Sequence, residues 1–127
     1  MISKQPIMPE RIRHISGSFS WLDHRLLTQG FLAAMTSAEI LLYCFLVLVG
    51  DKNGVSFYSY DQICQLLKLE VADYIAARDR LLQRSLIAHQ QGRFQVLELP
   101  KQIVQLSEPP RVDEFRAIKA IFQSLMQ

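Results

Sequence analysis

Three neighbouring side chains, Asp23, His24 and Arg25, bring a carboxylate, an imidazole and a guanidinium together just after Trp21. Such a group suggests acid–base chemistry with His24 as the base. The simpler interpretation, which we favour, is the start of a helix that Asp23 caps and in which Arg25 pairs locally. The sequence also lacks a nucleophile elbow, a phosphate-binding loop and a dinucleotide-binding fingerprint. We therefore expect no catalytic residue and no enzyme activity.

The other metal-ligating and nucleophilic side chains are sparse. His14, His24 and His89 are the only histidines, and their spacing does not resemble that of a metal site. Cys44 and Cys64 lie among apolar residues and lack the paired spacing of a zinc or redox site, which favours buried free thiols. We expect no metal, no cofactor and a reducing, cytoplasmic environment.

Composition allows one domain of ordinary size, since 127 residues of which 50% are hydrophobic can bury a core without metals or disulfides. The most apolar run, Ile40 to Val49, is too short for a bilayer, which needs about 20 residues. The first nine residues contain no apolar run of signal-peptide length. We expect no export and no membrane partner.

Charge is unevenly distributed along the chain. Residues 36–100 contain six basic and seven acidic side chains, a net charge of −1, whereas the two flanking segments hold the basic surplus. Lys and Arg supply most of the nonspecific affinity for nucleic acid. Strong nonspecific DNA binding by the central segment alone is therefore not expected.

The first third of the chain predicts an arm followed by a short helix. Residues 1–15 look extended, with Arg11, Arg13 and His14 alternating with isoleucines, as an arm or an edge strand would. Ser20, with Asp23 three residues on, resembles an N-cap that opens a helix through Gln29, and Gly30 then stops it.

The middle of the chain begins with a capping box, formed by Thr36 and Glu39 directly before the run Ile40 to Val49, which predicts a central helix. Asp51 to Gly54 is a turn signal. The β-prone piece Val55 to Tyr58 after it is expected to pair with a hairpin.

Two further helices are predicted next, joined by a tight turn at residues 68–70. The first starts near a cap at Ser59 or Asp61 and has apolar residues at helical spacing. The second runs from Glu70 to Ser85. Its apolar residues form two overlapping phases at helical spacing, 74–77–81 and 71–75–82, so the sequence does not decide which face of the helix points outward.

Two strand-like runs follow, Leu86 to Gln90 and Phe94 to Leu99, separated by residues 91–93 in the manner of a hairpin with a short loop. After prolines, Val112 to Met126 predict an amphipathic helix. Its apolar stripe consists of Phe115, Ile118, Phe122 and Leu125. Such a stripe needs a partner surface, so we expect a homodimer held partly by this helix.

The segment from Thr36 to Leu99 resembles the winged-helix superfamily of bacterial DNA-binding proteins, which includes transcription regulators and the N-terminal domains of replication initiators. The resemblance lies in the run from Ser59 to Glu70, which follows the family's spacing of a Ser, an aromatic residue, a small residue and a turn. The family's Gly-Leu-Ile ending corresponds to Ser85-Leu86-Ile87. The match covers about half of the chain and is more specific for fold than for function.

The resemblance implies a mainly α (α+β) winged helix-turn-helix with a small β-hairpin wing and extra N- and C-terminal helices. It divides the chain into residues 1–35, an arm and short helix, 36–100, the winged-helix domain, and 101–127, a linker and amphipathic helix. The helix Glu70 to Ser85 would enter a groove of double-stranded DNA. The implied DNA-binding residues are Arg78, Arg80, Gln83, Arg84, His89 and Arg93.

Three positions depart from the family's pattern. Lys68 stands where glycine is usual, Glu70 where a serine cap is usual, and residues 71–73 are Val, Ala and Asp, which offer few contacts to bases. The primary hypothesis is a small protein that regulates transcription, or the replication of a mobile element, by occupying DNA. The alternative is a winged-helix adaptor that binds a protein instead.

Overall fold

The computed structural model of the chain describes residues 4–106. Within that range the protein is α+β, with five α-helices and one three-stranded antiparallel sheet. The helices are α1 (Arg25–Thr28), α2 (Phe31–Ala34), α3 (Ser37–Val49), α4 (Tyr60–Leu67) and α5 (Val71–Gln83). The strands are β1 (Val55–Phe57), β2 (Ile87–Gln90) and β3 (Arg93–Val96), and a 3-10 turn, η1, covers Pro9–Arg11.

The central helix α3 starts where the capping box predicts. Thr36 is the N-cap, its hydroxyl accepts a hydrogen bond from the Glu39 amide, and Glu39 accepts one from the Thr36 amide. These two bonds satisfy amide groups that the first helical turn leaves without partners. The helix ends at Gly50, and the predicted turn follows, closed by a bond from the Gly54 amide to the Asp51 carbonyl.

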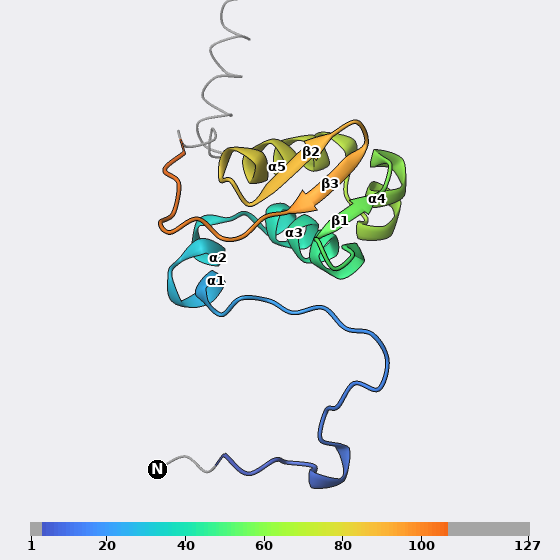
Figure 1. Cartoon of the computed structure of the whole chain (residues 1–127), viewed down its shortest axis with the longest axis vertical. Coiled ribbons are helices and arrows are strands. Elements are labelled where there is room, and N and C mark those ends of the chain that lie inside the picture. The colour runs from blue at the N-terminus through green and yellow to red at the C-terminus, as the bar shows by residue number, and fades with distance from the viewer. Residues whose placement is uncertain (1–3, 107–127) are drawn as a thin grey trace, which may run out of the picture.

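The sheet has the strand order β1-β3-β2, so the last strand lies in the middle. Residue Ser56 pairs with Phe94, and His89 pairs with the same Phe94 from the other side. The predicted pairing of the Val55 to Tyr58 segment with the hairpin is confirmed. Figure 1 shows β2 and β3 lying across α3 and α5. These strands and helices together enclose the core.

The hairpin loop is shorter than the sequence suggested. Its two residues, Gln91 and Gly92, both have positive φ angles (52° and 78°), as the favoured two-residue hairpin turn requires. Arg93 is therefore the first residue of β3 and not part of the loop, and β3 ends at Val96 and not at Leu99. The two strands otherwise lie where they were predicted.

The turn between α4 and α5 also lies at residues 68–70. Lys68 adopts the left-handed conformation, with φ at 58°, and the Leu69 amide bonds to the Cys64 carbonyl. A glycine is the usual residue for such a helix end. Lysine adopts the same backbone conformation here, although its Cβ makes that conformation less favourable than for glycine.

The N-terminal prediction needs correction. The first helix begins at Arg25 and not near Ser20, whose hydroxyl instead contacts the Leu48 carbonyl. A second short helix, α2, follows Gly30, which takes the left-handed conformation between them. Residues 4–19 are exposed, form no strand and run away from the rest of the described chain (Figure 1), so the alternative of an edge strand is wrong for these residues.

Candidate functional site

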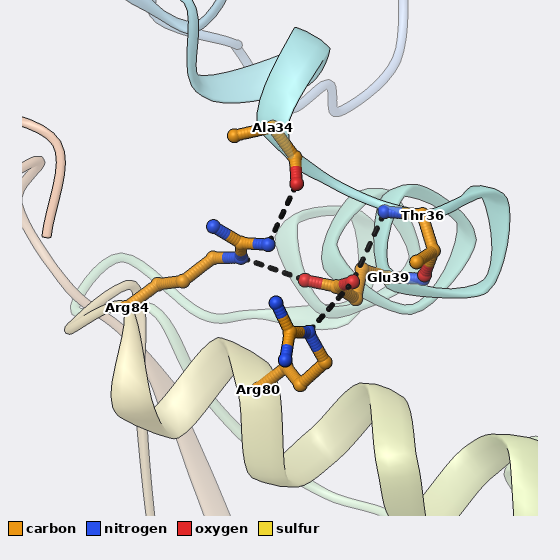
Figure 2. Close-up of polar contacts among 5 residues, drawn as sticks. All are labelled: Ala34, Thr36, Glu39, Arg80 and Arg84. Carbon is orange, nitrogen blue, oxygen red and sulfur yellow. Dashed lines mark hydrogen bonds and ion pairs between the residues drawn. The ribbon is translucent and has the colours of Figure 1, made fainter. Parts of the chain in front are cut away.

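The basic residues at the end of α5 turn toward the interior. Figure 2 shows the guanidinium groups of Arg80 and Arg84 facing the carboxylate of Glu39. Arg84 Nε lies 2.7 Å from Glu39 Oε1, and Arg84 Nη2 donates to the Ala34 carbonyl at 2.7 Å. Arg80 Nε lies 3.4 Å from Glu39 Oε2. One carboxylate therefore joins α3 to the end of α5, and α2 is tied to the same cluster.

This buried cluster changes the candidate DNA-binding set. Glu39 is fully buried and Arg84 is 6% exposed, so the Arg84 guanidinium is not open to a phosphate. The Arg80 side chain is mostly covered as well. The expectation that Arg80 and Arg84 face DNA is corrected accordingly, because a buried carboxylate holds both. Gln83 stays exposed at the last turn of α5.

The pKa of Glu39 reflects two opposing influences. Burial alone would raise the pKa, because it disfavours the charged form. Together, the hydrogen bonds from Arg84 and Thr36 outweigh the effect of burial, so the pKa of Glu39 falls below its ordinary value of 4.5. Glu39 is therefore ionised in the folded protein at neutral pH.

The lowered pKa of Glu39 predicts that the folded protein loses stability in acid. A carboxyl group with a lowered pKa in the folded state stabilises that state above its unfolded pKa and ceases to do so as the pH falls. We expect the free energy of unfolding, measured by urea titration, to decline as the pH drops below about 4.5. The decline should be shallower in a Glu39→Gln variant, in which other carboxylates still titrate. Equal slopes in the two proteins would contradict this role for Glu39.

The outward side of α5 is apolar near the start of the helix. Tyr74, Ala77 and Leu81 are buried, so the 74–77–81 phase is the inner one. The other phase leaves Val71 and Ile75 exposed on the outer face. The first turn also holds two carboxylates, the exposed Asp73 and the N-cap Glu70, which lie on other sides of the helix than Val71 and Ile75. Such a face suits a protein better than it suits phosphate.

Arg78 is the one basic side chain of α5 left outside the Glu39 cluster. Its Nη2 lies 3.1 Å from Asp79 Oδ1, and its guanidinium carbon lies 5.7 Å from the centre of the Tyr74 ring. The side chain is partly exposed, and pairing with a surface carboxylate is weak. Arg78 is therefore positioned to exchange Asp79 for a phosphate at small cost.

The hairpin contributes one exposed cation and one covered imidazole. Arg93 is exposed, and it lies opposite Phe57 on one side and Gln90 on the other. The His89 ring stacks on Phe94, with centres 4.0 Å apart. Burial, with a smaller contribution from the charge of Arg78, lowers the pKa of His89 below 6.5. His89 is thus neutral at pH 7 and offers no positive charge to a phosphate.

The arm holds the most accessible basic residues. Lys4, Arg11, Arg13 and His14 are all exposed, and none of them forms an ion pair within residues 4–106. The family resemblance does not place Arg11 and Arg13 among the expected DNA contacts, because it begins only at Thr36. The uneven charge distribution along the sequence was the signal that pointed to them.

The Asp23, His24 and Arg25 group forms a local cap. Asp23 Oδ1 accepts from the Arg25 amide at 2.8 Å, and Asp23 Oδ2 pairs with Arg25 Nη2 at 2.7 Å. The hydrogen bonds from the Arg25 side chain and amide lower the pKa of Asp23. The pair lies beside a groove of about 630 Å³ that Trp21, Tyr43 and Glu98 help to line. His24 is exposed, and no hydrogen bond to a side chain of residues 4–106 orients its imidazole.

Neither cysteine is activated. Both are free thiols, and burial raises the pKa of Cys44 and of Cys64. Among residues 4–106, no three His, Cys, Asp or Glu side chains are grouped as a metal site would require. No helix in that range is long and apolar enough to cross a membrane. The expected dimer residues Phe115, Ile118, Phe122 and Leu125 lie outside the described residues.

Comparison of the chain with protein-family models, with curated proteins and with solved structures gave no match.

Proposed function

We propose that this protein is a winged-helix DNA-binding protein that acts by occupying its site, in transcription or in the control of a mobile element's replication. The element order α3, β1, α4, α5, β2, β3 supports the fold, with a three-residue turn between α4 and α5 and β3 between the other strands. The process is suggested by the family resemblance of residues 36–99.

The observation that carries the proposal is the exposed basic arm. Arg11 and Arg13 lie on a segment that extends from the folded body (Figure 1), as do the arms with which several DNA-binding proteins reach the minor groove. Arg78 and Arg93 add charge near α5 and the hairpin. In this arrangement the arm supplies most of the phosphate contacts and α5 supplies few, in keeping with the net charge of −1 in residues 36–100.

The arm is tested by removing its charge. We expect the double variant Arg11→Gln, Arg13→Gln to bind a random-sequence duplex more weakly and to lower the slope of log affinity against log salt by about two units, one for each phosphate that the variant leaves unneutralised. Fluorescence anisotropy across a salt series measures both quantities.

The control removes the same charge elsewhere. Lys52 and Lys101 are exposed side chains outside the arm, and the variant Lys52→Gln, Lys101→Gln should keep nearly the wild-type slope. Equal reductions in affinity and slope for the two variants would contradict a specific role for the arm. Absence of DNA binding by the wild type at low salt would contradict the function itself, because electrostatic attraction has its longest range there.

A second function, binding of a protein partner, is favoured by one observation. The exposed Val71 and Ile75 give α5 an apolar patch on its outer side, where DNA-reading helices usually offer Arg, Lys, Asn or Gln. An adaptor would use that face, and its binding would persist in the arm variant. DNA binding that depends on the arm favours the first function over this one.

A further inference from the structure

After its first turn, helix α3 is apolar on all sides. Between Glu39 and Asp51 the chain contains no charged residue. Leu42, Tyr43 and Leu46 are buried on the side that packs against the core. The opposite side contains Leu41, Cys44 and Leu48, which follow one another at steps of three and four residues and which we term the outer stripe.

The outer stripe is open to water in the single chain. Leu41 is 45% exposed and Leu48 is 70% exposed, and Cys44 between them is partly exposed. A surface helix normally places polar residues opposite the core, whereas a helix that is apolar all round is normally buried. The outer stripe therefore has the composition of a covered surface.

The flank of the stripe extends it. Phe45, half-buried, packs edge-on against Tyr58, with ring centres 5.2 Å apart. The ion pairs of the described chain lie elsewhere: Glu39 is buried on the core side with Arg80 and Arg84, and the remaining pairs belong to α1 and α5. No charge interrupts the apolar face along α3.

We propose that a second copy of this chain covers the outer stripe, with the two α3 helices antiparallel about a two-fold axis. The steps from Ser37 through Leu41 and Cys44 to Leu48 are four, three and four residues, the spacing with which two helices interleave their side chains. Because the stripe is uncharged, two identical copies meet on it without like-charge repulsion, as an isologous interface requires.

The ends of the helix favour the antiparallel arrangement. The helix dipole leaves partial positive charge at the N-terminus and partial negative charge at the C-terminus, and antiparallel pairing brings opposite ends together. It also brings the exposed Asp51, whose Oδ1 accepts from the Asn53 and Val55 amides of its own turn, toward the N-terminus of the partner helix. A carboxylate is favourable at that position. A parallel pair would instead place like ends side by side.

The small size of the outer stripe limits the affinity expected of the dimer. Thirteen helical residues span about 20 Å. With Phe45 and Tyr58 on the flank, this provides part of the about 800 Å² per partner that a stable interface buries. We therefore expect a dimer that dissociates in the micromolar range. The outer face of α5 lies across the core from the stripe and stays free.

Sedimentation equilibrium of the full chain tests the proposal. Wild type should be dimeric at high micromolar concentration, and the variant Leu41→Lys, Leu48→Lys should be monomeric. The matched control Leu27→Lys, Leu66→Lys places the same charges on strongly exposed leucines of α1 and α4 and should remain dimeric. Circular dichroism identifies whether both variants keep the wild-type helix content.

Chemical cross-linking locates the interface independently of any lysine variant. A short bis-maleimide should join two chains through Cys44 in wild type and in Cys64→Ser, but not in Cys44→Ser. A monomeric wild type at high micromolar concentration would overturn the proposal. So would a dimer that survives Leu41→Lys, Leu48→Lys and is abolished in Phe115→Ser, Phe122→Ser, since it would then depend on the C-terminal stripe. These readouts need no DNA, so they stand apart from the proposed function.

Discussion

Replacing Glu39 with alanine is expected to destabilise the protein by about 3 to 5 kcal/mol, the cost of breaking a buried ion pair on one side. The substitution leaves the Arg84 guanidinium buried and uncompensated, and leaves the mostly covered Arg80 without its partner. It also removes the carboxylate that bonds the Thr36 amide in the capping box. The free energy of unfolding in urea measures the loss.

Asp79→Ala is the matched control for Glu39→Ala. It removes a carboxylate from Arg78 at the surface, where an ion pair contributes at most about 1 kcal/mol. A further variant, Glu39→Met with Arg80→Met and Arg84→Met, removes all three charges of the cluster together and should recover part of the stability, because apolar side chains of similar volume replace such groups well. If Glu39→Ala costs no more than Asp79→Ala, the cluster does not hold α3 against α5.

Local signals predicted most of the fold because their partners are close in sequence. The capping box from Thr36 to Glu39 and the turn from Asp51 to Gly54 each span four residues. Both lie where they were predicted, and so does the strand after the turn. The start of the N-terminal helix was misplaced because Asp23 caps through the Arg25 amide, two residues on. Its predicted end before Gly30 is right, and a second short helix follows that glycine.

The site was harder to predict because its decisive contact is long-range. Glu39 and Arg84 are separated by 45 residues, so no local pattern shows that Arg84 turns inward. A carboxylate at the start of a long apolar helix was the available hint, since a buried acid needs a basic partner. Burial of Tyr74, Ala77 and Leu81 defines the inner face of α5, which the two overlapping apolar phases left open. Val71 and Ile75 then face outward, and the basic face expected of α5 is reduced to Arg78.

Replacing Phe94 with alanine is expected to cost about 3 to 5 kcal/mol, the usual loss for removing a buried phenyl ring. Phe94 is 1% exposed and lies in the middle strand of the sheet, paired with Ser56 on one side and His89 on the other. Its ring therefore joins the hairpin, β1 and the helical core, and a cavity at this position weakens all three. Urea denaturation, followed by circular dichroism, measures the change.

A second phenylalanine of the same sheet provides the control. Phe57 in β1 is 68% exposed, so Phe57→Ala should change the free energy of unfolding by only about 0.5 kcal/mol. His89 supplies a separate readout, because burial is the main cause of its lowered pKa and its ring stacks on Phe94. In Phe94→Ala the imidazole becomes better hydrated, so its pKa, followed by NMR titration, should rise toward 6.5. Equal stability losses for the two phenylalanines, or an unchanged His89 pKa in folded Phe94→Ala, would show that the hairpin is not anchored through this ring.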